Sequence, residues 1–381
     1  MSEYNAQRPT SAKINLDNLA YNFHSVKKFV GQNLKYMAVV KADAYGHNSI
    51  QCARRLEAEG IDWFGVALPE EGVELRNSGI RKLILCLGSF WFGQEKLLLD
   101  NNLTPVIYQI EKALSFNKTA KERGTIADVH IKVDTGMGRI GVRFDEVREF
   151  AEKLKDLKNI RIEGLMTHFA AADNLNENYF TDLQIKRFKE TVAIFENKGF
   201  RPVYKDLANS PGAIVHEESR ENMVRIGGVL YGLGDDVLPQ EVRKPDLKPV
   251  MSLSTRIAHL KKVPKGETLG YSRTFRTQRD SLIATIPIGY EDGLPRVLSN
   301  QGRVLINGQF APMVGRISMD WTIVDVTDIP NVKLEDEVVI IGESNGLRIS
   351  AEELAQKSDT ISYEITCRIN RRVTREYVGS K

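Results

Sequence analysis

The amino-acid sequence predicts an α/β fold in which an N-terminal (β/α)8 barrel of the TIM type precedes a C-terminal, mostly β domain. Two observations lead to this prediction. Between about residues 35 and 232, short apolar runs alternate with longer amphipathic segments. Beyond residue 250, apolar and polar residues alternate one by one, which is typical of strands that bury one face.

The apolar runs of the first region predict eight parallel strands. They lie at residues 36–43, 63–68, 82–88, 103–108, 128–134, 162–168, 204–210 and 222–228. Helical patterns separate most of them. The clearest covers 181–199, where Ile185, Phe188 and Val192 recur three and four residues apart before a stop at Gly199. Eight strands with interposed helices favour a closed barrel.

A doubly wound open sheet is the main alternative fold. The one G-x-G-x-x-G match, residues 136–141, follows the fifth predicted strand but does not open the next helical pattern, which starts near residue 145, so it lacks the context of a dinucleotide-binding turn. That pattern is not required of every open sheet, so this argument disfavours the open sheet without excluding it.

The junction between the two domains is predicted at 234–250, a polar stretch with three prolines. The barrel is therefore expected to span residues 1–240 and the β domain 241–381, although the first residues of the chain could pair with the β domain. In the second domain, Met251 and Leu253 alternate with serines, and Asn307-Gly308 between two apolar runs predicts a hairpin.

Composition excludes several classes of protein. A net charge of +3, from 53 basic and 50 acidic residues, gives no electrostatic case for nucleic-acid binding. Three scattered cysteines are too few for a disulfide framework or a zinc site. The first residues lack the apolar core of a signal peptide, and no apolar run approaches the roughly 18 residues of a membrane span. A cytoplasmic protein that binds neither membrane nor metal is expected.

Chemically versatile residues collect at the carboxyl ends of the predicted strands. They are Lys41, which closes the first strand, Lys132 and Asp134 in the fifth, His168 in the sixth, Asn209 and Ser210 at the end of the seventh, and Arg225, Gly227 and Gly228 in the eighth. Active sites of this barrel lie on that face, and a phosphate often binds after strands seven and eight. The shared position therefore predicts one active site.

Each of these residues also has a structural interpretation. A lysine at a strand end is usually a surface residue whose stem lies along apolar surface. A glycine pair more often marks a bulge, and Tyr45 could pack with its hydroxyl in water. The common location of all of them favours function, because separate structural roles would not gather them at one face.

An amine nucleophile beside phosphate-binding groups, without a metal-ligand cluster, points to a lysine that forms a Schiff base with pyridoxal phosphate. Burial of Lys41 among its apolar predecessors Ala38–Val40 is expected to favour the neutral amine. Arg225 can only donate hydrogen bonds. Placed against the pyridine nitrogen, it would leave that nitrogen unprotonated and favour proton exchange at Cα over reactions that need a long-lived carbanion.

Sequence blocks in both domains carry a family resemblance. They are AVVKADAYGH (38–47), KVDTGMGRIGV (132–142), ANSPGA (208–213), VRIGGVLYG (224–232), GYSRTF (270–275), IGYEDGLPR (288–296), VGRISMD (314–320) and ISYEITCRI (361–369). In this order they resemble the alanine racemases, pyridoxal-phosphate enzymes of fold-type III, over nearly the whole chain. Asn48 departs from the family pattern, which usually has glycine there.

The resemblance implies roles for the catalytic pair. Lys41 would carry the cofactor and act as one base, on the face associated with the D enantiomer. Tyr271 would be the opposite-face base and would reach the cofactor from the partner subunit of a homodimer. Arg225 would face the pyridine nitrogen, and His168 would link Arg225 to Tyr271.

The resemblance also implies the binding residues. Phosphate would be held by Tyr45, Ser210, Gly227, Gly228 and Tyr363, with Asn209 in the same cofactor-binding group. Arg139 would bind the substrate carboxylate and the phenolic oxygen of the cofactor, and a carbamylated Lys132 would fix Arg139. Met319 and Asp320 would line the partner's side of the pocket, with Tyr290 and Arg296 at its mouth.

The implied activity is interconversion of L- and D-alanine, which would supply D-alanine for peptidoglycan. Three alternatives stay open. A racemase for serine, lysine or many substrates would differ in pocket width. A fold-type III decarboxylase would place a carboxylate where Arg225 is expected. A non-catalytic protein that binds pyridoxal phosphate would need neither the second domain nor Tyr271.

Overall fold

The computed structural model describes residues 8–379 and divides the chain into two compact units. The larger unit comprises Leu19–Ala44 and Asn48–Lys248. The smaller unit contains the chain up to Asn18, Tyr45–His47 and the part from Pro249 onward. The three residues 45–47 therefore group with the smaller unit although both flanking segments belong to the larger one.

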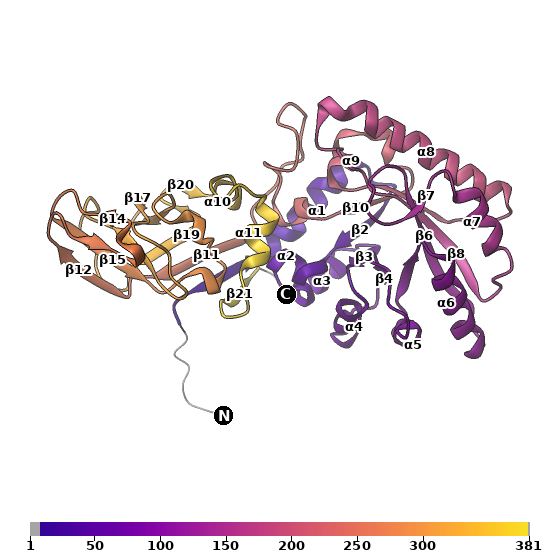
Figure 1. Ribbon diagram of the computed structural model, residues 1–381, viewed down its shortest axis with the longest axis horizontal. Helices are drawn as coiled ribbons and strands as arrows, with labels where there is room; N and C mark the ends of the chain where they lie inside the picture. The colour runs from indigo at the N-terminus through magenta and orange to yellow at the C-terminus, as the bar shows by residue number, and fades with distance from the viewer. Residues whose placement is uncertain (1–7, 380–381) are drawn as a thin grey trace. The chain divides into compact units, whose positions relative to one another are not determined.

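Parallel strands close into a barrel in the larger unit (Figure 1). They are β2 (Lys35–Val39), β3 (Trp63–Val66), β4 (Leu83–Cys86), β5 (Thr104–Ile107), β6 (Ala127–Asp134), β8 (Ile160–Met166), β9 (Tyr204–Ala208) and β10 (Met223–Ile226). β10 pairs with β2, and β5 pairs with β6, so the ring is complete. The predicted (β/α)8 barrel is confirmed, and the open-sheet alternative is wrong because an open sheet would leave two unpaired edges.

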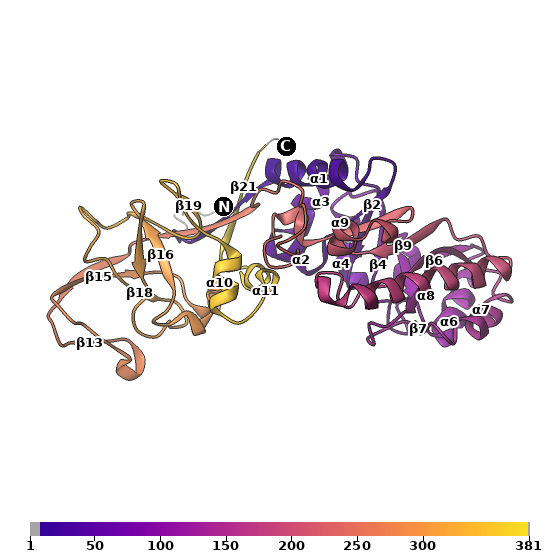
Figure 2. The same cartoon turned by 90° about the horizontal axis from the view of Figure 1, so that it is seen from above.

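Helices follow most of the strands and lie on the outside of the barrel in both views (Figures 1 and 2). They are α3 (Ser49–Ala58), α4 (Pro69–Asn77), α5 (Glu95–Asp100), α6 (Ile110–Glu122), α7 (Val147–Leu154), α8 (Asn178–Asn197) and α9 (Ser210–Val215), with α1 (Leu16–Val30) before the first strand. Short elements complete this part: β7 (Val142–Arg143), η1 (Leu175–Glu177), η2 (Glu217–Ser219) and η3 (Gly228–Tyr231). The helix predicted over 181–199 lies within α8, where Ile185, Phe188 and Phe195 are buried.

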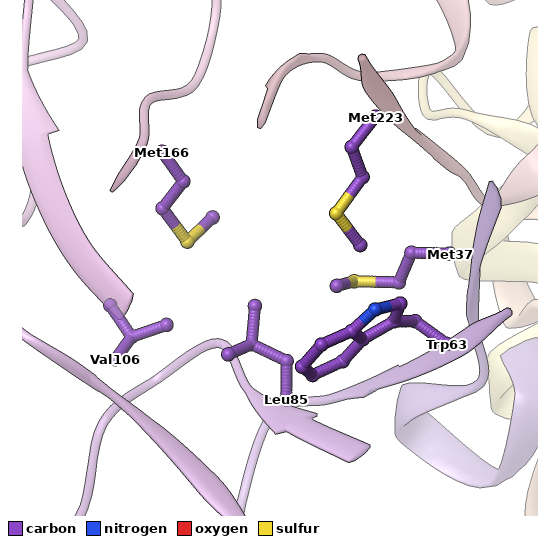
Figure 3. Packing of buried hydrophobic residues seen from close by; sticks show 6 residues of the cluster. All are labelled: Met37, Trp63, Leu85, Val106, Met166 and Met223. Atoms are coloured by element: carbon purple, nitrogen blue, oxygen red, sulfur yellow. The ribbon is translucent and has the colours of Figure 1, made fainter. Parts of the chain in front are cut away.

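The barrel interior is filled by apolar side chains from different strands (Figure 3). They are Met37, Trp63, Leu85, Val106, Met166 and Met223, all buried. Figure 3 shows these side chains converging on one centre. Arg225 lies two positions after Met223, and His168 lies two positions after Met166, both toward the carboxyl ends of their strands. Because alternate residues of a strand face the same side, they are expected to face the same way as these methionines. The apolar layer therefore forms the floor beneath the polar residues.

The smaller unit is mostly β. Its largest sheet contains β17 (Gln309–Pro312), β16 (Arg303–Ile306), β19 (Glu337–Ser344), β11 (Met251–Arg256), β1 (Ser11–Asn15) and β21 (Thr374–Val378), with β20 (Leu347–Ile349) beside β19. A second sheet contains β12 (His259–Val263), β15 (Ser281–Ile286) and β18 (Thr322–Asp325), and β13 (Thr268–Leu269) pairs with β14 (Phe275–Arg276). The helical elements are η4 (Tyr271–Arg273), η5 (Tyr290–Asp292), η6 (Arg296–Leu298), α10 (Ala351–Lys357) and α11 (Ser362–Arg368).

The alternating pattern and the hairpin predicted for this unit are both present. Met251 and Leu253 of β11 are buried, while Ser252 and Ser254 are partly exposed. β16 and β17 join through Asn307 and Gly308, whose φ angles of 48° and 72° suit a two-residue hairpin. The N-terminal strand β1 pairs with both β11 and β21. Within residues 8–379, no helix has the length and apolar character that crossing a membrane requires.

Candidate active site

Lys41 opens a turn with unusual backbone geometry. The turn, α2 (Lys41–Gly46), starts two residues after β2. Ala42, Asp43, Ala44 and Tyr45 all have φ between 52° and 55°, so this short helix is left-handed. Such a conformation costs about 1–2 kcal/mol per non-glycine residue. Neighbouring groups must therefore hold the turn in place.

The predicted burial of Lys41 is wrong. Ala38, Val39 and Val40 are buried, but Lys41 is exposed. The reason is that β2 ends at Val39, and the chain leaves the packed interior before Lys41. Lys41 thus lies at the rim of the barrel rather than inside it.

Asn48 has two structural roles that account for its presence. Its φ of 75° lies in the left-handed region, where glycine and asparagine are favoured. Its side-chain Oδ1 also accepts a hydrogen bond of 3.0 Å from the Gln51 N–H and caps α3. Asparagine therefore adopts the conformation that suits glycine and adds a helix cap.

Arg225 is buried in the barrel, and both of its terminal nitrogens have hydrogen-bond partners. Its Nη1 forms an ion pair with Asp206, and its Nη2 donates to the Thr167 carbonyl at 2.9 Å. The same Nη2 lies 3.2 Å from Nδ1 of His168. Asp206 is completely buried, so the pair compensates two charges that would each be costly alone. Asp206 was missed in the sequence, where its signal is a carboxylate inside an otherwise apolar strand end.

His168 is neutral in this environment. Burial, followed by repulsion from Arg225 and Lys132, lowers its pKa to about 2. Because a guanidinium only donates, Nδ1 must accept from Arg225, and the imidazole proton is then assigned to Nε2. His168 therefore offers an N–H donor on the side away from Arg225.

Lys132 is buried on β6 beside the same cations. Burial, together with repulsion from Arg225, Arg139 and Lys41, lowers its pKa to about 7. A large fraction of this amine is uncharged near neutral pH. An uncharged amine is the form that reacts with carbon dioxide, so this environment suits the expected carbamylation.

Arg139 lies on a loop that Asp134 shapes. The Asp134 carboxylate accepts hydrogen bonds from the N–H groups of Gly136 at 2.9 Å and Gly138 at 3.0 Å. Gly138 and Gly141 have φ angles of 70° and 140°. These contacts present Arg139 at the carboxyl end of β6, where it is exposed and close enough to act on Lys132 and His168.

The predicted phosphate-binding residues of the barrel contact one another. The Ser210 Oγ accepts a hydrogen bond of 3.0 Å from the Gly227 N–H, and Gly228 begins η3. Asn209 caps α9, since its Oδ1 accepts from the Gly212 N–H at 3.0 Å. The Asn209 side chain therefore shapes the loop that carries Ser210.

Tyr45 and Tyr363 lie together in the smaller unit. Their rings pack edge to face, with centroids 5.1 Å apart and planes at 81°. Burial raises the pKa of Tyr45, so its hydroxyl stays protonated and can donate a hydrogen bond. Two of the predicted phosphate ligands are thus neighbours although they are far apart in sequence.

The other predicted residues of the smaller unit are mostly exposed. Tyr271 in η4 is 69% exposed and Met319 is 49% exposed. The Tyr271 loop is shaped by Gly270, Ser272 and Arg273, with φ angles of 72°, 58° and 52°. Asp320 forms an ion pair of 2.6 Å with Arg372.

Tyr290 and Arg296 line one cleft of about 660 Å³. Its walls also include Leu294, Pro295 and Arg368. The predicted pair at the mouth of the pocket therefore shares a surface within the smaller unit.

Comparison with known proteins agrees with this architecture. Residues 14–235 match the family model "Alanine racemase, N-terminal domain", and residues 250–377 match "Alanine racemase, C-terminal domain". An alanine racemase of Halothermothrix orenii is 47% identical over 97% of both chains, and one of Geobacter sulfurreducens is 42% identical over 98% of both.

Solved structures of alanine racemases are also similar. The one from Clostridium difficile 630 has a TM-score of 0.91 and 37% identity, covering 99% of this chain and 97% of that one. The one from Bartonella henselae, solved with covalently bound pyridoxal phosphate, has a TM-score of 0.88 and 28% identity, covering 97% and 99%. Matches to both domains over nearly the full length show that the chain belongs to the alanine racemase family.

Proposed function

We propose that this protein is a pyridoxal-phosphate-dependent isomerase that interconverts L- and D-alanine. The observation that carries the proposal is the buried Arg225, which is paired with Asp206 and contacts a neutral His168 at the carboxyl end of the barrel. The relatives' names support alanine as the substrate.

The barrel residues fit pyridoxal phosphate. Lys41 supplies a primary amine at the rim, and Ser210 and the loop before η3 supply polar groups suited to a phosphate. Lys41, Lys132, Arg139 and Arg225 act electrostatically on one another or on His168, so positive charge is concentrated here. An anionic cofactor and a substrate carboxylate would balance that charge.

Bound pyridoxal phosphate would act as an electron sink that makes the Cα proton of the amino acid acidic. Inversion at Cα then requires proton removal on one face and return on the other, so two bases are needed. We assign Lys41 to the D-enantiomer face and Tyr271 to the L-enantiomer face. The Nε2–H of His168 is suited to stabilise an oxyanion such as a deprotonated tyrosine.

Arg225 favours this reaction over decarboxylation. A guanidinium at the pyridine nitrogen cannot supply a proton as a carboxylic acid could. Asp206 is the nearby carboxylate, but it is engaged by Arg225. Arg139 would hold the substrate carboxylate, and a carbamate on Lys132 would supply the negative charge that fixes Arg139.

We further infer that the active enzyme is a homodimer in which Tyr271, Tyr290, Arg296, Met319 and Asp320 complete the partner's site. The exposure of Tyr271 and Met319 supports this, because a base and a pocket residue would otherwise face water. The corresponding cellular role is the supply of D-alanine for peptidoglycan by an enzyme in the cytoplasm.

The test is to load the protein with pyridoxal phosphate and incubate it with L-alanine in deuterated water. We expect D-alanine that carries deuterium at Cα. Release of ethylamine would instead indicate a decarboxylase, and no exchange with any amino acid would indicate a cofactor-binding protein. Rates for alanine, serine and lysine measured side by side would define the breadth of the substrate pocket.

A further inference from the structure

The Glu71 carboxylate connects the residue after Lys41 to a second loop of the barrel. Its Oε1 accepts a hydrogen bond of 2.7 Å from the Ala42 N–H. Its Oε2 accepts from the N–H groups of Ala67 at 2.7 Å and Leu68 at 3.1 Å. Glu71 belongs to the first turn of α4, so the turn that carries Lys41 is linked to the β3–α4 loop.

The Ala42 N–H is the point at which the chain enters the left-handed turn. Ala42 is the first residue with positive φ, at 52°, and the following residues keep that conformation. This conformation is intrinsically unfavourable for alanine and tyrosine, because their Cβ atoms are crowded there. A strained segment persists only where surrounding contacts fix it, and Glu71 supplies such a contact directly beside Lys41.

Helix capping explains only part of this arrangement. The contact of Oε2 with the Leu68 N–H belongs to a capping box at the start of α4. The contact of Oε1 with Ala42 does nothing for α4. The neighbouring Glu70 accepts instead from the side chain of Gln94 at 2.6 Å. A glutamate in the first turn of α4 therefore need not bind α2.

We propose that Glu71 is a positioning residue for catalysis. It holds the left-handed turn so that the Lys41 amine stays at the position where it must bind the cofactor and exchange the Cα proton. This inference rests on the proposed role of Lys41. A carboxylate suits the task because its two oxygens accept three N–H groups from two separate segments.

The first experiment compares Glu71→Ala and Glu71→Gln with Glu74→Ala, an exposed position on the same helix. We expect Glu71→Ala to lower kcat about ten-fold, the factor that corresponds to releasing one strained residue. The KM for alanine should change little, and the visible cofactor band should appear more slowly when pyridoxal phosphate is added. Glu71→Gln keeps one acceptor oxygen and should be intermediate, while Glu74→Ala should match the wild type.

A second-site change separates positioning from capping. Glycine adopts positive φ without steric cost, so Ala42→Gly in the Glu71→Ala background should recover much of the lost kcat. A residue needed only to cap α4 would not be rescued by a change in α2. Failure of this rescue, with the double variant folded and loaded, would overturn the proposal.

Borohydride reduction of the loaded wild type followed by peptide mass spectrometry keeps the two proposals distinguishable. Cofactor attached to another lysine would refute the function proposed for Lys41. Cofactor on Lys41, with wild-type kcat and loading rate in both Glu71→Ala and Glu71→Gln, would refute the role of Glu71 alone. If Glu71→Ala does not fold, the kcat and the cofactor-loading rate of Glu71→Gln test the role of Glu71 in the same way.

Discussion

Asn48 meets two structural requirements at once: it adopts a left-handed backbone conformation, and its side chain caps α3. Glycine would permit the φ of 75° but would leave the Gln51 N–H without its side-chain acceptor. The sequence alone gave no reason for an asparagine here, because neither the positive φ nor the helix start at Ser49 can be recognised from the neighbouring residues. The backbone geometry supplies that reason.

Substitution at Asn48 should therefore separate the two contributions. Asn48→Ala loses the cap and also the tolerance of asparagine for the left-handed region, so the free energy of unfolding should fall by about 2 kcal/mol. Asn48→Gly loses only the cap and should cost a few tenths of a kcal/mol. Urea unfolding measures both. Equal losses would show that the conformation of residue 48 contributes nothing.

Asp206 is the counter-ion of the most buried cation in the site. Asp206→Asn should lower the free energy of unfolding by about 3 kcal/mol, because Arg225 would be left buried without a compensating charge. Asp145→Asn breaks the exposed pair with Arg143 and should have a much smaller effect, because solvent screens this pair. Urea unfolding of both variants measures the two losses in the free energy of unfolding. An Asp206→Asn effect as small as the control would contradict the role of the buried pair.

At the level of secondary-structure elements, strands and regular helices could be predicted, but α2 could not. Strand positions followed from apolar runs, and α8 followed from its helical spacing. The residues of α2 are ordinary helix formers, with no glycine before Gly46. Their left-handed conformation depends on contacts such as that of Glu71, which lies 29 positions away from Ala42. Such tertiary contacts leave no local pattern in the sequence.

Neighbouring strands bury a second titratable pair beside the apolar floor. The His130 ring of β6 stacks on Tyr204 at 5.8 Å and packs against Trp63 at 5.3 Å. Glu163 of β8 lies 3.9 Å from His130 Nε2. Burial lowers the pKa of His130 to about 3, so the two do not form an ion pair at neutral pH.

The pH dependence of stability should report on Glu163. Burial, and then repulsion from Asp128, raises its pKa from an ordinary value of 4.5 to about 7, opposed by Arg161. Between those values the folded protein holds a proton that the unfolded chain has lost, so this contribution to stability falls as pH rises. Glu163→Gln should remove that part of the slope between pH 4.5 and 7. An unchanged slope in urea titrations would contradict the assignment.

For the whole molecule, the barrel followed by a β domain was predictable, but the assignment of residues 45–47 was not. These residues pack closely within the smaller unit: a Cβ on Gly46 would lie 2.1 Å from the Thr366 carbonyl oxygen. The chain therefore passes from the larger unit to the smaller one after Ala44. Predictions from periodicity place whole segments, so they cannot detect a three-residue excursion.

The proposed homodimer, in which Tyr271 would serve the partner's site, predicts complementation between inactive subunits. Lys41→Ala and Tyr271→Phe homodimers each lack one proposed base, whereas a mixed dimer contains one site with both bases intact. Unfolding the two variants together and refolding them should restore about a quarter of wild-type activity, if subunits pair at random. Mixed dimers that form but stay inactive would show that Tyr271 does not serve the partner's site.

The two-base assignment is tested most directly by Cα exchange in Tyr271→Phe, measured separately from each enantiomer in deuterated water. We expect the variant to bind pyridoxal phosphate at Lys41 and to exchange the Cα proton of D-alanine without inversion. It should neither exchange L-alanine nor racemise either enantiomer at a wild-type rate. Wild-type racemisation, or an equal loss of exchange with both enantiomers, would contradict the assignment of Lys41 and Tyr271 to opposite faces.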